Sequence, residues 1–317
     1  MITLSKLAVC DMADYIPLNI VKVLALKEGL CDCGAARCEK LDLTYLKDWL
    51  ANGYNASMTY LANYFDKRED PTLLFENTRT VFCFLMSYND ENVTENKQFK
   101  IASYAQRRDY HHIIKQKLNS IITQLQSQYP NLQAKAFVDS APVMEREWAV
   151  RCGLGWKGKN SLLVTKQFGN KIFIGEILAN CISDYTQEIP NHCGNCNKCL
   201  SSCPNNAILE NGTIDANRCI SYQTIENKGN ISSDIDLKNY IYGCDICLNA
   251  CIWNNKAKKI DVQDSDVKSL VCRILDKIEN NEDFKTEFQQ LRKLSPMDRI
   301  KYSKLLSNID FVKKQNQ

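Results

Sequence analysis

The 317-residue sequence lacks the features of a membrane or exported protein. It has no run of about 18 apolar residues, so we expect no membrane span. The N-terminus has no basic segment leading into an apolar core and a cleavage site, and it carries no twin-arginine pair. We therefore expect a cytoplasmic protein. Its 44% hydrophobic and 24% charged residues are typical of a folded chain.

Histidine is scarce and the net charge is small. Three histidines, His111, His112 and His192, are too few for a His-rich metal site. A net charge of +3 does not by itself indicate a polyanionic partner. The region after residue 252 is richer in lysine, with "KAKK" at 256–259. Composition leaves two interpretations open for it, a solvated helical surface or part of a polyanion-binding face.

Cysteine, in contrast, is abundant, with 16 residues. Disulfides are disfavoured without an export signal, so clustered cysteines should be metal ligands or catalytic groups. Eight of them lie between residues 193 and 251. The others match no cluster spacing, and we expect them to pack as small hydrophobic side chains: Cys10, Cys31, Cys33, Cys38, Cys83, Cys152, Cys181 and Cys272.

The segment "CGNCNKCLSSCP" at 193–204 has the spacing C-x2-C-x2-C-x3-C-P of bacterial ferredoxins, whose fourth cysteine ligates the other cluster of a pair. Four downstream cysteines complete a set of eight. Zinc ribbons use two separated Cys-x2-Cys pairs, so the spacing favours two 4Fe-4S clusters over zinc. The expected ligands are Cys193, Cys196, Cys199 and Cys251 for cluster 1, and Cys203, Cys219, Cys244 and Cys247 for cluster 2.

Hydrophobic periodicity in the first 185 residues indicates an α+β or α/β fold. We expect three domains, at 1–185, 186–256 and 257–317. The expected elements are helices over 43–53, 109–130 and 143–152, strands over 80–88 and 135–139, and a hairpin over 161–178 that turns at 168–170.

The glycine-rich segment "RCGLGWKGKNSLLV" at 151–164 could approach a nucleotide or another phosphate-bearing ligand. Asn160 follows Lys159, where a P-loop requires Ser or Thr. Gly153, Gly155 and Gly158 match G-x-G-x-x-G, but the segment follows a helix and precedes a strand, the reverse of a dinucleotide-binding motif.

Asp139 ends the apolar run Ala136-Phe137-Val138 and precedes a turn. A carboxylate in this position has two interpretations, a catalytic acid or a cap of the following helix. The residues alone do not decide between them.

Several motifs together resemble the epoxyqueuosine reductase family. They are "VDSAPVMERE", "GLGWKGKNSLL", "FGNKIFIGEIL", "RCISY", the eight cysteines and, more weakly, "REDP" and "YAQRRDYH". The resemblance implies an N-terminal α/β cobalamin-binding domain on a nitroreductase-like scaffold, a ferredoxin-like domain and a short helical tail. It also implies reduction of epoxyqueuosine to queuosine at the wobble position of tRNA, with electrons passing through the clusters to cobalamin.

The same resemblance implies roles for individual residues. Asp139 would donate the proton that the departing epoxide oxygen needs, and packing against an apolar corrinoid would raise its pKa. No D-x-H-x-x-G motif is present, so we expect cobalamin without a protein imidazole ligand. The implied cobalamin contacts are Arg68, Asp139, Arg146, Lys159, Asn160, Ser161, Leu163, Val164, Thr165 and Ser221.

The sequence departs from the family pattern at Ile252, where proline is usual, and at Lys157, where an apolar residue is usual. It resembles the short form without C-terminal helical repeats, so we expect the basic tail and the ferredoxin face to hold the tRNA. We also expect a monomer that accepts electrons from an unidentified reductant. The competing functions are a corrinoid reductive dehalogenase and a two-cluster electron carrier.

Overall fold

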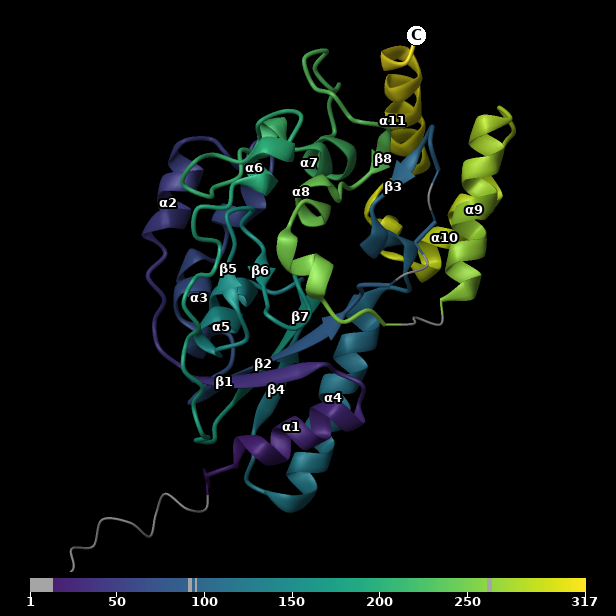
Figure 1. The fold of residues 1–317 in the computed structure, drawn as a ribbon. Coiled ribbons are helices and arrows are strands. Elements are labelled where there is room, and N and C mark those ends of the chain that lie inside the picture. The colour runs from purple at the N-terminus through teal and green to yellow at the C-terminus, as the bar shows by residue number, and fades with distance from the viewer. Residues whose placement is uncertain (1–13, 91–92, 95, 261–263) are drawn as a thin grey trace, which may run out of the picture.

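A four-stranded antiparallel sheet lies at the centre of the protein (Figure 1). The structure is a computed structural model that describes residues 14–90, 93–94, 96–260 and 264–317. The central strands β2 and β7 are buried along almost their whole length, as expected for β-branched and aromatic runs. In sheet order the strands are β1 (Asp32–Arg37), β2 (Thr80–Ser87), β7 (Ile172–Ala179) and β4 (Ala134–Phe137).

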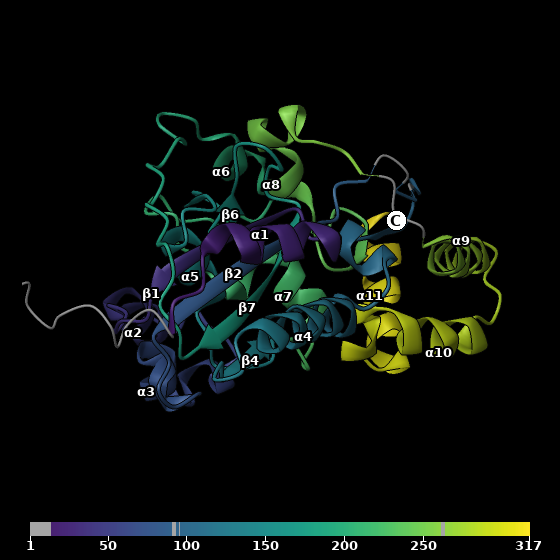
Figure 2. The ribbon, with the colours of Figure 1, turned by 90° about the horizontal axis from the view of Figure 1, so that it is seen from below.

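Helices cover both faces of this sheet. Helices α1 (Leu18–Lys27) and α4 (Tyr110–Gln128) pack on one face (Figure 2). Helix α5 (Glu145–Arg151) packs on the other, where Trp148 is fully buried. Helices α2 (Thr44–Ala51) and α3 (Phe65–Glu69) follow strand β1. The sheet is therefore the middle layer of an α+β fold, which confirms the expected fold class.

The expected helices and strands of this region are present with shorter bounds, but the expected hairpin is wrong. Its turn exists, because the Thr165 N–H donates to the Gly169 carbonyl over 2.8 Å. However, β6 (Leu163–Val164) pairs with β5 (Trp156–Lys157) instead of β7. Both edges of β7 are already bonded to β2 and β4, so β7 has no free edge for β6.

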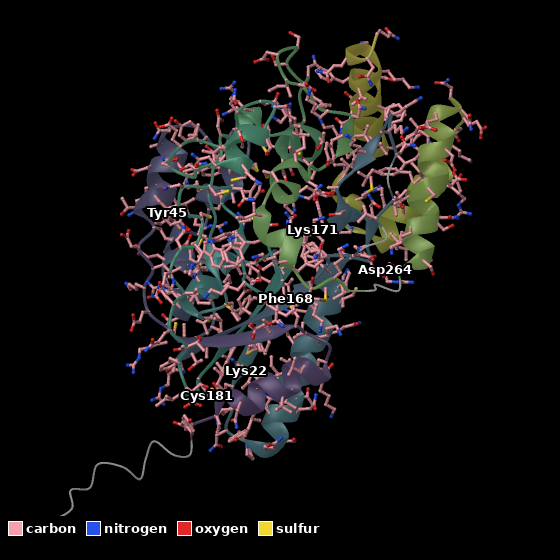
Figure 3. All side chains as sticks on the ribbon, viewed as in Figure 1. Lys22, Tyr45, Phe168, Lys171, Cys181 and Asp264 are labelled. Carbon is pink, nitrogen blue, oxygen red and sulfur yellow. The ribbon has the colours of Figure 1, made fainter. Side chains whose placement is uncertain are left out.

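Most of the cysteines outside the 193–251 block pack as predicted. Cys33, Cys83, Cys152 and Cys181 are buried (Figure 3 labels Cys181). Cys31 and Cys38 are half-buried, and Cys272 is exposed, which contradicts the expectation for that residue. Cys10 lies outside the described residues.

Short helices dominate the cysteine-rich region: α6 (Lys198–Ser202), α7 (Ile220–Ile225) and α8 (Ile246–Asn249). Strand β3 (Lys100–Ile101) pairs in parallel with β8 (Tyr240–Tyr242). The chain ends with α9 (Ser265–Glu279), α10 (Lys285–Leu294) and α11 (Tyr302–Gln315).

These three C-terminal helices do not stand apart from the rest of the chain. Their apolar faces share one hydrophobic cluster with residues from 99–105 and 220–242. The domain bounds drawn from the sequence stay a prediction. In the part of the chain that the structure describes, no helix has the length and apolar character that a bilayer crossing requires.

Candidate active site and cluster ligands

Asp139 lies just beyond β4 in a left-handed backbone conformation, with φ of 51°. It does not cap α5, because that helix begins at Glu145 after Met144 and has no side-chain cap. The helix-cap interpretation is therefore wrong. Instead, the Asp139 N–H donates to Oε1 of Glu145 over 2.5 Å, which fixes the loop and leaves the Asp139 carboxylate available for other contacts.

The Asp139 carboxylate contacts two side chains from the start of α4. The Tyr110 hydroxyl donates to Oδ2 over 2.6 Å, and His111 Nε2 lies 2.9 Å from the same oxygen. The other ring nitrogen, Nδ1, lies 2.6 Å from Oδ1 of Asp109. Asp109 is the N-cap of α4 and also accepts from the His111 N–H. His111 is therefore held between two carboxylates.

This arrangement places the proton on His111. Burial opposes the charged imidazolium, but the hydrogen bonds to Asp109 and Asp139 outweigh that effect and raise the pKa of His111 to about 9. The hydrogen bond from His111, aided by that from Tyr110, lowers the pKa of Asp139 to about 2 despite burial. The direction for Asp139 is opposite to the one expected beside an apolar corrinoid. At neutral pH the pair is an imidazolium and a carboxylate.

Two further carboxyls lie behind Asp139. Burial and the charge of Asp139 raise the pKa of Glu145 to about 7. Glu176 on β7 is fully buried, and its carboxyl oxygens have no hydrogen-bond partner within the described part of the chain. Burial raises the pKa of Glu176 well above its ordinary value, which favours the neutral carboxyl.

Arg299, a cation from the C-terminal region, also influences the pKa of Asp139. Arg299 ends the short helix η7 (Pro296–Arg299), and its Nη2 lies 2.6 Å from Oε1 of Glu226 and 3.3 Å from the Tyr60 hydroxyl. Its charge contributes to the lowered pKa of Asp139. The side chain is half exposed, so Arg299 lies between the interior of the site and solvent.

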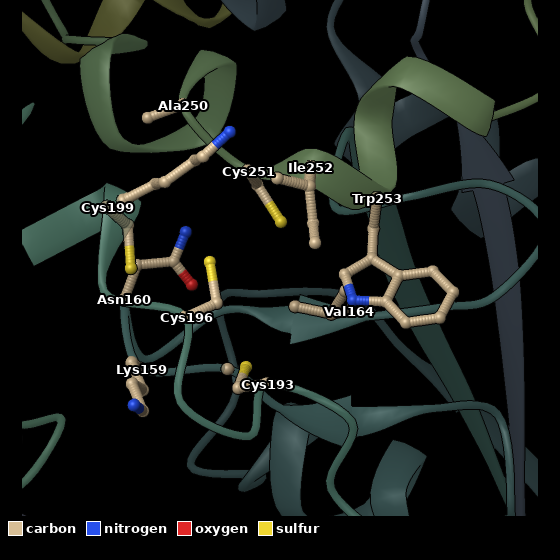
Figure 4. A pocket seen from close by; sticks show the side chains of 12 residues that line it. Lys159, Asn160, Val164, Cys193, Cys196, Cys199, Ala250, Cys251, Ile252 and Trp253 are labelled. Atoms are coloured by element: carbon tan, nitrogen blue, oxygen red, sulfur yellow. The ribbon is translucent and has the colours of Figure 1, made fainter.

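The four cysteines expected to hold cluster 1 surround one cavity (Figure 4). They come from the 193–199 loop, the start of α6 and the segment after α8. Lys159, Asn160, Val164 and Trp253 also line this cavity. Within the described residues, no three His, Cys, Asp or Glu side chains converge as a site for a single metal ion. Four thiols that surround one cavity fit the ligand set of a 4Fe-4S cluster. They belong to Cys193, Cys196, Cys199 and Cys251.

The four cysteines expected to hold cluster 2 form a separate group. Burial raises the pKa of Cys244 to about 12, and the nearby thiols of Cys219 and Cys203 contribute to the shift. Burial also raises the pKa of Cys247, and the neighbouring thiols of Cys244, Cys219 and Cys203 add to the shift. Cys244 and Cys247 also pack against two different hydrophobic cores. The group therefore lies deeper than the first one, between the two cores.

The residues expected to contact cobalamin fall into two groups. Arg146 Nη1 donates to the Ser161 carbonyl over 3.0 Å. Arg68 lies near the half-exposed rings of Tyr45 and Tyr60. These side chains offer cations and an aromatic surface near Asp139, which fits a large ligand with amide and phosphate groups.

The other expected contacts lie nearer the cysteines. Lys159, Asn160 and Val164 line the cluster 1 cavity, and Asn160 Nδ2 also donates to the Cys247 carbonyl over 3.4 Å. Leu163 and Thr165 are buried. Ser221 lies two residues after Cys219 at the start of α7. Their roles as cobalamin contacts stay a prediction.

Three residues that contact Asp139 were not identified from the sequence: Tyr110, His111 and Glu145. A signal for two of them exists, because Asp109 is a favourable N-cap before a long amphipathic run and so places Tyr110 and His111 in the first turn of α4. Glu145 is one of two glutamates in "MERE", and nothing in the sequence shows that Glu145 bonds the Asp139 N–H while Glu147 pairs with Lys157.

Two family models match the chain. Residues 68–140 match the family described as epoxyqueuosine reductase QueG, DUF1730, and residues 192–254 match the 4Fe-4S double cluster binding domain. The second match spans all eight cysteines. The protein therefore carries two 4Fe-4S clusters, as the spacing predicted.

Similar proteins agree with the family models. Epoxyqueuosine reductase of Cyclobacterium marinum is 39% identical over 94% of this chain and 97% of its own, and that of Cellulophaga algicola is 35% identical over 93% and 97%. The structure of epoxyqueuosine reductase from Streptococcus thermophilus matches with a TM-score of 0.79 and 27% identity, over 93% of this chain and 80% of that one. The chain belongs to the epoxyqueuosine reductase family.

Proposed function

We propose that this protein reduces epoxyqueuosine in tRNA to queuosine, using cobalamin and two 4Fe-4S clusters. The observation that carries the proposal is the combination of two cysteine sets with the Asp139–His111 pair in one chain. Family membership supports it. So does a 26% identical structure, with a TM-score of 0.68, of epoxyqueuosine reductase with a tRNA-Tyr stem loop modified with epoxyqueuosine.

The reaction requires electrons and protons together. Converting an epoxide to an alkene consumes two electrons and two protons, and the oxygen leaves as water. Cobalamin, when bound, would supply a strongly reducing cobalt centre for breaking the carbon–oxygen bond. The clusters would supply electrons one at a time, so the protein residues have to position the substrate and deliver protons.

The Asp139–His111 pair is suited to that proton delivery. The imidazolium of His111 holds a proton at neutral pH, and its Nε2 is 2.9 Å from Asp139 Oδ2. As negative charge develops on the epoxide oxygen, a proton can pass from His111 through Asp139. Asp139 is then the group that faces the oxygen, and His111 is the group that recharges it. Tyr110 fixes the orientation of the carboxylate.

The loop that carries Asp139 is itself a candidate moving part. A 25% identical structure of epoxyqueuosine reductase from Bacillus subtilis, with a TM-score of 0.64, has its catalytic aspartate loop swung out of the active site. In the present chain, Asp139 has a positive φ and its loop is held by Glu145. We propose that Asp139 is the catalytic aspartate and that Glu145 holds the inward position.

Two surfaces are proposed for the macromolecular partners. Arg299 and Tyr60 lie beside Asp139 and would contact the tRNA near its wobble nucleotide. Two lysines, Lys159 and Lys198, line the cluster 1 cavity, and no Asp or Glu among the described residues lines it. This charge would favour an acidic electron-donor protein, and docking should weaken as ionic strength rises.

A complementation experiment tests the proposed function in cells. The chain is expressed in a bacterial strain that lacks epoxyqueuosine reductase activity, and the nucleosides of its tRNA are separated by mass. We expect queuosine to appear while epoxyqueuosine declines. If epoxyqueuosine persists at the level of the empty-vector control while the protein accumulates with its clusters, the proposed function is wrong.

A further inference from the structure

Trp156 lies beside the cysteines of cluster 1, within a group of three rings. It is only 1% exposed, and its indole Nε1 donates to Sγ of Cys193 over 3.4 Å. The His192 ring packs edge-on against it with a centroid distance of 5.1 Å, and the Trp253 ring does so at 4.9 Å. Two neighbouring rings therefore fix the plane of the Trp156 indole and the direction of its N–H.

The backbone holds this indole equally firmly. Trp156 pairs with Val164 in the β5–β6 ribbon. A Cβ on Gly155 would lie 2.2 Å from the Val164 carbonyl oxygen, so only glycine allows the two strands to approach this closely. The strand pairing thus fixes the backbone of Trp156, and the two rings fix its indole.

We propose that Trp156 is a positioning residue for electron transfer, which raises the reduction potential of cluster 1 through its N–H···S hydrogen bond to Cys193. Reduction adds negative charge to the cluster and its ligating sulfurs. A hydrogen-bond donor stabilises the reduced form more than the oxidised form, and hydrogen bonds to the sulfurs are one of the factors that set cluster potentials. The inference rests on the assignment of Cys193 to cluster 1 and does not depend on the tRNA reaction.

The two clusters differ in the donors that reach their ligating sulfurs. Among the described residues, the side-chain donor to these eight cysteines is Trp156, on Cys193. The donors to the cluster 2 sulfurs are backbone N–H groups, such as that of Ala207, which donates to Cys203 Sγ over 3.3 Å. A substitution at Trp156 removes a side-chain donor from cluster 1 alone, so cluster 2 serves as an internal reference.

A higher potential at cluster 1 has a place in the electron path. The cluster 1 cysteines line a cavity whose rim includes the exposed side chains Lys198 and Ile252, whereas the cluster 2 cysteines lie between two hydrophobic cores. Cluster 1 is thus the one that an external donor can approach. The Trp156 bond makes this cluster easier to reduce, and it holds the electron until cluster 2 accepts it.

The test compares the protein with its Trp156→Phe variant by anaerobic redox titration, followed by electron paramagnetic resonance of the reduced clusters. Phenylalanine keeps an aromatic ring in the group but removes the N–H. We expect the potential of one cluster to become more negative and the other to stay unchanged. Trp148→Phe, which removes a buried indole N–H in the core under α5, should leave both potentials unchanged. Two unchanged potentials in Trp156→Phe would overturn the proposal.

A measurement on the unaltered protein covers the case in which Trp156→Phe does not assemble its clusters. The protein is labelled with indole-¹⁵N tryptophan, and electron spin echo envelope modulation is recorded on reduced cluster 1. We expect a ¹⁵N coupling, because the indole nitrogen is bonded through its proton to a ligating sulfur. Absence of that coupling contradicts the proposal. No tRNA is present in either measurement, so failure here is distinct from failure of the proposed reaction.

Discussion

The proton at the candidate active site is held by His111, while Asp139 carries the negative charge. His111 lies between Asp109 and Asp139, and its pKa is raised to about 9. Asp139, with a pKa of about 2, cannot itself store a proton at neutral pH. An aspartate in this position acts as a general acid only if a neighbour recharges it, and His111 is bonded directly to the relevant oxygen.

Replacing Asp139 with Asn should remove most of the activity. The amide keeps the size of the side chain and can still accept from Tyr110, but it cannot pass on a proton. General acid catalysis contributes about 100- to 10,000-fold, and we expect a loss of kcat in that range. Single-turnover rates with cofactor-loaded protein measure it. Full turnover by Asp139→Asn would exclude the proton-donor role.

Replacing His111 with Gln should change the pH profile. The His111 pKa is raised, so the imidazolium is fully formed below the ordinary value of about 6.5 and is lost as pH rises through about 9. We expect kcat of the parent protein to fall as pH rises through 9, and His111→Gln to have lower activity without that alkaline limb. His112→Gln is the matched control, because the His112 side chain is largely exposed. If the His111→Gln variant keeps the alkaline limb, His111 is not the source of the proton.

For single residues, the sequence predicted the position of Asp139 but not its protonation state. The strand end and the family motif point to the residue, whereas its pKa depends on Tyr110 and His111, which lie 29 and 28 positions away. Similarly, the eight-cysteine set follows from local spacing. The burial of Glu176, whose carboxyl has no hydrogen-bond partner among the described residues, could not be predicted, because it depends on the packing of α5 over β7.

Among the elements, the contact between β1 and the end of α5 determines how the second face of the sheet is covered. Gly34 on β1 lies under Cys152, and a Cβ at Gly34 would be 2.0 Å from the Cys152 carbonyl oxygen. The Thr186 hydroxyl bonds the carbonyls of both Ala35 and Cys152. This junction holds α5, whose first residue, Glu145, anchors the Asp139 loop.

Gly34→Ala should therefore destabilise the protein and loosen the site. Backbone atoms cannot yield to the added methyl group, so α5 must shift, and overpacking of this kind costs about 1–3 kcal/mol or more. The measurement is the thermal unfolding midpoint at a fixed scan rate. Gly229→Ala is the control, because the added Cβ would meet only a side-chain oxygen of Asn227 at 3.3 Å. Equal midpoints for the two variants would contradict the account of this junction.

Secondary-structure patterns in the sequence predicted most elements but not their pairing. The apolar run of β2 and the 19-residue helix α4 were visible as patterns. β1, within "CDCGAARC", was not, since its small residues lack a strand signature and the sheet itself buries them. The partner of β6 was predicted wrongly, because edge availability on β7 is a property of the whole sheet.

For the whole molecule, the C-terminal segment is part of the folded body and reaches the candidate active site. Helices α9 to α11 share a core with residues 99–105 and 220–242. Arg299 connects this segment to Glu226 near α7 and to Tyr60. The sequence indicated a helical tail, but the long-range packing that brings Arg299 toward Asp139 has no local signal.

Arg299→Gln should weaken tRNA binding. Loss of one cation near the wobble nucleotide should reduce affinity several-fold and lower the salt dependence of binding by roughly one phosphate contact. Fluorescence anisotropy of an anticodon stem loop across several salt concentrations measures both. Lys313→Gln, in the same segment but bonded to Asn281, is the control. Stability should change little, since an exposed ion pair contributes about 0–1 kcal/mol. Identical salt slopes for the Arg299→Gln variant and the parent protein would exclude the contact.

The most direct test of the central claim is mass spectrometry of tRNA nucleosides after reaction with purified protein. The protein is loaded with cobalamin, reduced anaerobically and mixed with tRNA that carries epoxyqueuosine. We predict that epoxyqueuosine is converted to queuosine with the loss of one oxygen atom. Asp139→Asn, measured in parallel, should convert far less. If epoxyqueuosine remains unchanged while spectroscopy shows reduced clusters and reduced cobalamin in the protein, the protein does not carry out this reaction.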